Sequence, residues 1–251
     1  PQGVLAQAVA TVLLPTFSAQ AARGEREALR ATLASASQAI GYLTLPATVG
    51  LIALSGPIVE MFFKRAAFDS QDVAMVAWAL TWYAVGLVAH SLLEIVTRAF
   101  YALHDTMTPV WVGGGAMLLN LALSIVLAWG FERAGSRYAA YQPWMPLGGL
   151  ALANSLATIG ETLALALILR RRLDGLDGRR LLSSAWRIGL GTVAMGGTLY
   201  AYLRLVPVHS PLLLGGTGML LAVGVFGVST LLLRSPEIDL VLAVVRRRWA
   251  R

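Results

Sequence analysis

The sequence predicts an all-α integral membrane protein with about seven transmembrane helices. Of its 251 residues, 57% are hydrophobic and only 13% are charged, and the mean hydropathy is +0.68. A soluble domain carries about one-quarter charged residues. Runs of about 20 apolar residues also recur along the chain, and each is long enough to cross a hydrocarbon core of roughly 30 Å. The chain is therefore expected to pass through a membrane several times.

Apolar runs between breaking residues define the predicted spans in order. They are expected at about 3–20, 34–56, 73–103, 109–131, 147–170, 186–205 and 211–233. The third run is too long for a simple crossing, because about 31 residues at about 1.5 Å each make roughly 46 Å. It is expected to project beyond the core. The chain opens inside an apolar run at Pro1, without a methionine, and is interpreted as a fragment of a longer protein.

The basic residues predict the orientation of these spans. Fifteen of the 20 lysines and arginines fall on one side of the predicted membrane and five on the other. Because cytoplasmic loops hold the excess of positive charge, the loops 21–33, 104–108 and 171–185 and the C-terminal tail are predicted to be cytoplasmic. The net charge of +7 then reflects topology, and no nucleic-acid partner is expected. The arginine clusters are also suited to anionic membrane lipids.

Three charged residues lie inside predicted spans and away from the terminal residues of those spans, and they are the candidates for a transport pathway. Glu94 precedes Arg98 by four residues, which is the favourable order for an ion pair on a helix. Such a pair either lines a polar pathway or locks the end of a helix, and the sequence supports both interpretations. Glu161 lies mid-span with no cation one turn away. A carboxylate there is expected to face protein or a water-filled cavity.

Small and polar residues in the spans favour close helix packing. Asn120 and Ser124 share one helix face, and Asn154 in the next span could meet them. Hydrogen bonding between helices is the ordinary role of such residues, and a small oxygen-lined cation site is the alternative. The glycine clusters at 113–115, 148–149 and 189–197 predict close helix contacts.

No residue pattern indicates an enzyme. The chain has no cysteine, and its three histidines, His90, His104 and His209, lack the spacing of a metal site. No glycine-rich phosphate loop follows a strand. A transporter without a cofactor or a metal centre is expected.

Several segments resemble one family, the MurJ/MviN family of lipid II flippases. The longest is "MFFKRAAFDSQDVAMVAWALTWYAVGLVAHSLLEIVTRAFYALHDTMTPV" at 61–110. Further matches are "PQGVLAQAVATVLLPTFS" at 1–18, "LTLPATVGL" at 43–51 and "GGLALANSLATIGETLALALILRRR" at 148–172. The segments occur in the order that the family has, which makes chance an unsatisfactory explanation.

The resemblance implies a fold and a function. Such proteins have 14 helices, which form two six-helix lobes plus two extra C-terminal helices, and they move undecaprenyl-linked lipid II across the bacterial cytoplasmic membrane by alternating access. Residues 1–172 would form second-lobe helices, 173–234 the two additional helices that hold the lipid tail in a groove, and 235–251 a basic cytoplasmic tail. The N-terminal lobe would be a missing partner of this chain.

The resemblance also implies a sodium site, which some family members carry. Its positions would fall on Asn120, Ser124, Leu150 and Asn154, and Ser124 stands where a carboxylate is expected. Coupling to sodium, protons or the membrane potential is left open. The alternatives are a flippase for another polysaccharide-lipid, a drug/cation antiporter, a membrane transferase and a non-transporting scaffold of cell-wall synthesis.

Overall fold

The computed structural model describes residues 2–63, 69–135, 142–206 and 210–233, and regular structure within these ranges is entirely α-helical. The predicted all-α class is confirmed. The tail 235–251, including its predicted cytoplasmic position, lies outside the described residues. The helices are α1 (Gln2–Ala22), α2 (Arg26–Ala53), α3 (Ser55–Phe63), α4 (Ser70–Val85), α5 (Leu87–Ala102), α6 (Met107–Gly135), α7 (Pro146–Arg172), α8 (Gly178–Leu205) and α9 (Pro211–Leu232).

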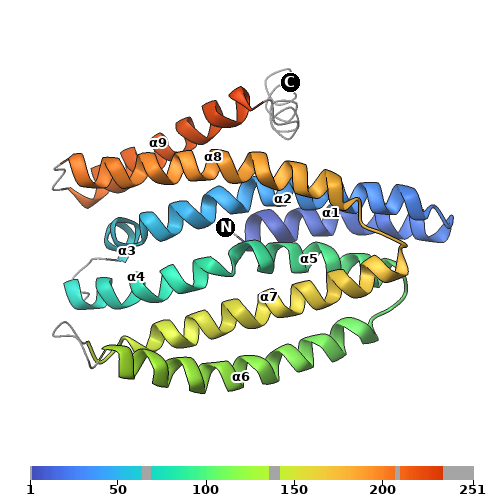
Figure 1. Cartoon of the computed structure of the whole chain (residues 1–251), viewed down its shortest axis with the longest axis horizontal. Coiled ribbons are helices and arrows are strands. Elements are labelled where there is room, and N and C mark those ends of the chain that lie inside the picture. Colours follow the sequence, from blue (N-terminus) through green and yellow to red (C-terminus); the bar gives the residue numbers. More distant parts are fainter. Residues whose placement is uncertain (1, 64–68, 136–141, 207–209, 234–251) are drawn as a thin grey trace.

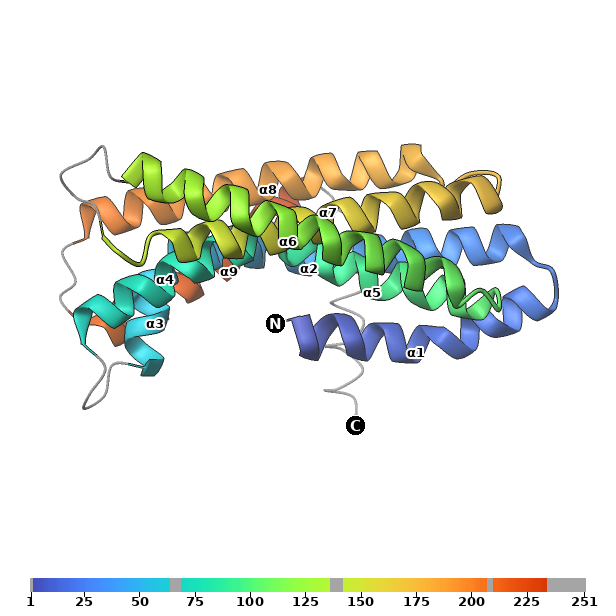
Figure 2. The ribbon, with the colours of Figure 1, turned by 90° about the horizontal axis from the view of Figure 1, so that it is seen from below.

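The helices lie alongside one another in an elongated bundle (Figure 1). The α1–α2, α5–α6 and α7–α8 connections meet at one end of the bundle, which we call the basic end. The start of α4 and the ends of α6 and α8 lie at the opposite end, the far end, in both views (Figure 2). The three connections that were predicted to be cytoplasmic therefore share one end of the molecule.

Two of these connections are shorter than the sequence predicts. The predicted loop 21–33 is reduced to 23–25, since α2 begins at Arg26, and the predicted loop 171–185 is reduced to 173–177. Hydropathy marks only the start of an apolar run. A helix can begin before that run, in residues that are mostly polar but place a few apolar side chains on one buried face. Leu29 and Leu33 supply that face in α2, where they are 1% and 4% exposed.

Helices occupy all seven predicted spans, although 34–56 is interrupted at Leu54, between α2 and α3, and 73–103 at Gly86. The helices are not all equally suited to cross a membrane. By length and composition, α2, α6, α7 and α9 pass a test for spanning helices, and α4 with α5 makes a fifth span as a bent pair. This test covers only part of α1, and α8 does not pass it. These two have 21 and 28 residues and pack against α5 and α2, respectively.

The third predicted span, 73–103, is broken at Gly86 instead of running straight. Helices α4 and α5 meet there at 46°. A Cβ atom on Gly86 would lie 2.9 Å from Cα of Ser155 on α7, so the glycine permits close contact. Ser155 Oγ donates a hydrogen bond of 2.8 Å to the carbonyl oxygen of Trp82. This carbonyl would otherwise lack its helical partner, because the Gly86 N–H points to Tyr83. The bend shortens the excess length that the sequence indicated.

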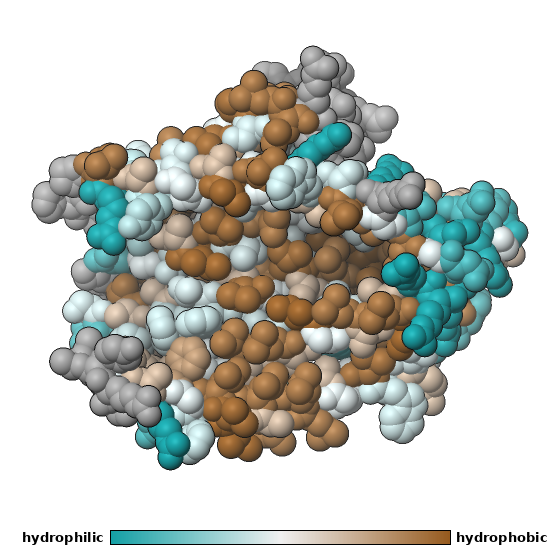
Figure 3. All heavy atoms as spheres, in the orientation of Figure 1, coloured by the Kyte–Doolittle hydropathy of each residue, from teal (hydrophilic) through white to brown (hydrophobic). Residues whose placement is uncertain are grey.

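Two apolar clusters hold the bundle together. The first joins α1, α2, α5 and α7 through Phe17, Leu29, Phe100 and Leu165, all of which are at most 1% exposed. The second joins α2 to α8 and α9. The outward face of α6 is apolar but belongs to neither cluster, and none of its most apolar window is buried. Figure 3 shows this surface as a broad hydrophobic area over α6, with hydrophilic residues gathered at the basic end.

Candidate functional site

The predicted ion pair between Glu94 and Arg98 is present on α5. Arg98 Nη2 lies 3.2 Å from Glu94 Oε2, and their side chains are 23% and 25% exposed, respectively. The pair shares a face of α5 with Tyr101, which is 40% exposed. Ala99 and Phe100 point the other way into the core. The pair is therefore accessible from one side of the bundle, as a polar pathway requires, and a role in locking the helix end is compatible with the same geometry.

His90, one turn before Glu94, has partners that its sequence context did not predict. Its Nε2 atom lies 3.1 Å from Asn154 Oδ1 and 3.2 Å from Thr158 Oγ1, both on α7. Asn154 and Thr158 are four residues apart and so present their side chains on one face. Thr162, one further turn along, donates to the carbonyl oxygen of Ala89 at 3.0 Å. A polar seam thus joins the middle of α5 to α7.

Glu161 adjoins this seam and is not isolated. It is partly buried, and it lies near enough to His90 for an electrostatic interaction. A Cβ atom on Gly113 of α6 would lie 3.2 Å from Glu161 Oε1, so the glycine leaves room for the carboxyl group. The sequence places no cation one turn from Glu161 on α7, whereas the structure places His90 of α5 close to it. The expectation that Glu161 faces protein is confirmed, and its role in transport stays a prediction.

The four residues of the predicted cation site do not share one hydrogen-bond network. Ser124 Oγ donates to Asn120 Oδ1 at 3.3 Å within α6. Asn154 is bonded to His90 on α5, and Leu150 is 41% exposed. Across the described ranges, no group of three or more His, Cys, Asp or Glu side chains could hold a metal ion. Sodium binding at Asn120, Ser124, Leu150 and Asn154 stays a prediction from resemblance.

Two glycines near the start of α7 let this helix pack more closely against its neighbours than residues with side chains would. A Cβ atom on Gly149 would lie 2.6 Å from the backbone carbon and oxygen of Leu127. A Cβ atom on Gly148 would lie 2.3 Å from Nε1 of Trp78, whose indole donates to the carbonyl oxygen of Met145 at 3.1 Å. The predicted glycine contact at 148–149 is confirmed, and it fixes the α7 face that carries Asn154 and Glu161.

Ion pairs tie the connections together at the basic end. Arg172 Nη1 lies 2.5 Å from Asp105 Oδ2, and Arg26 Nη1 lies 3.5 Å from Asp174 Oδ2. Asp105 also accepts bonds from the Thr108 hydroxyl, at 2.6 Å, and from the Thr108 backbone N–H, at 2.9 Å. These two bonds, followed by the charge of Arg172, hold the pKa of Asp105 below its usual value. Asp105 thereby caps the start of α6 as a carboxylate.

The change Asp105→Ala should lower the stability of the purified protein at pH 7 by about 1 kcal/mol, the usual cost of a lost helix cap. The folded state lowers the pKa of Asp105. Its stabilisation is therefore present above the unfolded pKa of about 3.9 and is lost as the pH falls through the folded pKa. Thermal unfolding in detergent at pH 7 and pH 3 should show a difference that shrinks in acid. Glu25→Ala, which removes only an exposed ion pair with Arg23, is the control, and an equal loss in both variants would contradict the capping role.

An apolar groove lies where the last two helices meet the bundle. It has a volume of about 550 Å³ and is lined by α2, α3, α8 and α9. Tyr42 and Phe226 form one wall, with ring centroids 5.0 Å apart, and Tyr42 Oη lies 3.0 Å from Thr230 Oγ1. The resemblance placed a groove for the lipid tail at the last two spans. The structure has an apolar groove there, and α2 contributes six of its 14 lining residues.

Comparisons with known proteins identify the family. The family model for lipid II flippase MurJ matches residues 1–214. A probable lipid II flippase MurJ of Rhizobium tropici is 29% identical over 234 residues, which are 92% of this chain and 40% of that protein. The lipid II flippase MurJ of Thermosipho africanus (strain TCF52B) is 31% identical over 159 residues, which are 63% of this chain and 30% of that protein.

A solved structure agrees with these sequence matches. The lipid II flippase MurJ in an inward closed conformation superposes with a TM-score of 0.70 at 26% identity, covering 96% of this chain and 45% of that chain. The chain thus spans less than half the length of these relatives. Its apolar helices and these matches make it a multi-pass inner-membrane protein. The chain belongs to the MurJ family of lipid II flippases.

Proposed function

We propose that this chain acts as the C-terminal half of a lipid II flippase, working with an N-terminal lobe to move lipid II across the cytoplasmic membrane by alternating access. One observation carries the proposal: a single bundle holds both an apolar groove of about 550 Å³ and a partly exposed Glu94–Arg98 pair. An amphipathic lipid with an anionic head needs both surfaces. The family match favours this function over the polysaccharide-lipid flippase and drug antiporter that were alternatives.

The orientation and the coupling belong to the same proposal. The basic end, with its arginines and short connections, would face the cytoplasm together with the C-terminus, because positive charge is retained there. The same arginines would bind anionic lipid headgroups. Coupling would use sodium, protons or the membrane potential. His90, Asn154 and Glu161 are the groups through which an ion would act, because they join α5 to α7 in the middle of the bundle.

Complementation tests the proposal. The gene that encodes this chain, expressed at its full natural length, should restore growth to bacteria depleted of their own lipid II flippase. Labelled lipid II should then reach the outer membrane face. The 251-residue chain alone is the matched control and should not restore growth, since the proposal requires an N-terminal lobe. Failure of the full-length protein, with its presence in the membrane verified by immunoblot, would contradict the proposed function.

A further inference from the structure

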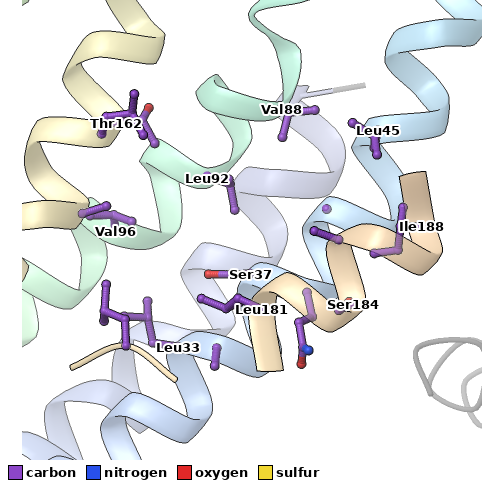
Figure 4. A pocket seen from close by; sticks show the side chains of 17 residues that line it. Leu33, Ser37, Leu45, Val88, Leu92, Val96, Thr162, Leu181, Ser184 and Ile188 are labelled. Carbon is purple, nitrogen blue, oxygen red and sulfur yellow. The ribbon is translucent and has the colours of Figure 1, made fainter. Parts of the chain in front are cut away.

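A second apolar groove lies between α2, α5, α7 and α8, and no residue of α9 lines it. Its volume is about 330 Å³, and its walls are almost entirely apolar. Figure 4 shows side chains of the four helices converging on one space, among them Leu33, Leu92, Val96 and Leu181. In the space-filling view the same region is a hydrophobic hollow bordered by hydrophilic residues of the basic end (Figure 3). The groove runs from this end toward the middle of the bundle.

The groove presents little to a polar ligand. Gln38 of α2 lines it, but its Nε2 donates to the backbone oxygen of Arg180 at 3.1 Å. Thr162 also lines it and already donates to the carbonyl oxygen of Ala89 at 3.0 Å. Both of these groups therefore have partners within the protein, and the small hydroxyl groups of Ser37 and Ser184 complete the polar part of the lining. The remaining lining is suited to a hydrocarbon chain, because apolar burial needs no directional partner.

One arginine stands at the rim of this groove. Arg180 precedes the lining residue Leu181, and its Nη2 lies 3.3 Å from Ser35 Oγ, next to the lining residue Ala34. Arg26 and Arg172 pair with Asp174 and Asp105. Among the residues that the structure describes, Arg180 has a neutral hydroxyl partner and no carboxylate. An exposed guanidinium of this kind is complementary to a phosphate group.

We propose that this groove binds one acyl chain of an anionic glycerophospholipid, with the lipid phosphate on Arg180. The ligand is a membrane lipid and not the transported substrate. The proposal rests on the headgroup binding proposed above for the basic end and adds the site that would hold the acyl chain. Two features favour this occupant. The cation lies at the polar end of an apolar groove, and the groove shares no lining from α9, whereas the larger groove of about 550 Å³ is lined by α9.

Photolabelling of the full-length protein in nanodiscs tests this site. The probe is phosphatidylglycerol with a diazirine in one acyl chain, diluted into phosphatidylcholine discs. Labels should map to the α2 and α8 segments that line the groove. Arg180→Gln should lower labelling by roughly fivefold, the size of one exposed charge contact. Arg171→Gln removes the same charge from an exposed arginine at the end of α7 and should leave labelling unchanged.

A second variant separates the chain from the headgroup. Gly41 lines the groove, and a Cβ atom there would meet nothing within 4 Å, so the side chain introduced by Gly41→Leu can start from open space and occupy part of the groove. It should reduce labelling while Arg180 stays in place. Equal labelling by phosphatidylglycerol and by a matched phosphatidylcholine probe would overturn the proposal. Displacement of the label by a polyprenyl phosphate would also overturn it, because the groove would then belong to the substrate. Neither readout depends on flipping, so failure here leaves the proposed function standing.

Discussion

Arg98→Ala in the full-length protein should lower lipid II flipping by roughly tenfold, while the amount of protein in the membrane stays normal. A hydrogen bond to a charged group contributes about 1.5–3 kcal/mol, and about 1.4 kcal/mol corresponds to a factor of ten. The lower end applies here, because the Arg98 side chain is 23% exposed and its field is partly screened. The measurement is the rate at which labelled lipid II reaches the outer face of depleted cells.

The reversed pair distinguishes the two interpretations of this site. Glu94→Arg combined with Arg98→Glu keeps an ion pair at the same i,i+4 spacing on α5 but moves the cation one turn deeper. Recovery of flipping in the reversed pair would mean that the charges lock the helix. Continued loss would mean that the position of Arg98 matters to the transported anion. Unchanged flipping in the single variant Arg98→Ala would contradict a transport role altogether.

Gly149→Ala should destabilise the protein by about 3 kcal/mol, the upper end of the cost of overpacking. The new methyl group would lie 2.6 Å from the backbone of Leu127, and a backbone cannot rotate away as a side chain can. Helices α6 and α7 would have to separate, which would disturb the positions of Asn154 and Glu161. Thermal unfolding in detergent should show a clear fall in Tm.

Gly114→Ala is the matched control on the facing helix. A Cβ atom on Gly114 would meet nothing within 4 Å, so alanine should leave the stability unchanged or raise it slightly through its higher helix propensity. Equal losses in Gly114→Ala and Gly149→Ala would show that the close contact between α6 and α7 is not what the glycine provides.

The glycines show how far sequence reasoning reaches. A cluster such as 113–115 indicates that helices can approach closely, but it does not say which glycine meets a neighbour. In the structure Gly113 faces Glu161, whereas Gly114 and Gly115 meet nothing within 4 Å. In the sequence, the three glycines at 113–115 are equivalent. The contact depends on the rotation of α6 about its axis, which its packing against α7 decides.

The sequence by itself determined the membrane class, the approximate spans, the shared basic end, the Glu94–Arg98 pair and the family. The class, the spans and the ion pair depend on hydropathy, charge and spacing within single segments, the basic end depends on the distribution of arginines among the loops, and the family depends on the resemblance of several segments in order. Only the tertiary structure decided the bend at Gly86, the polar seam of His90 with Asn154 and Thr158, and the two grooves. Within a bilayer a polar group must find a partner in the protein because little water is available, and for His90 that partner lies on another helix. The identity of that partner follows from how the helices pack, and a single segment does not contain it.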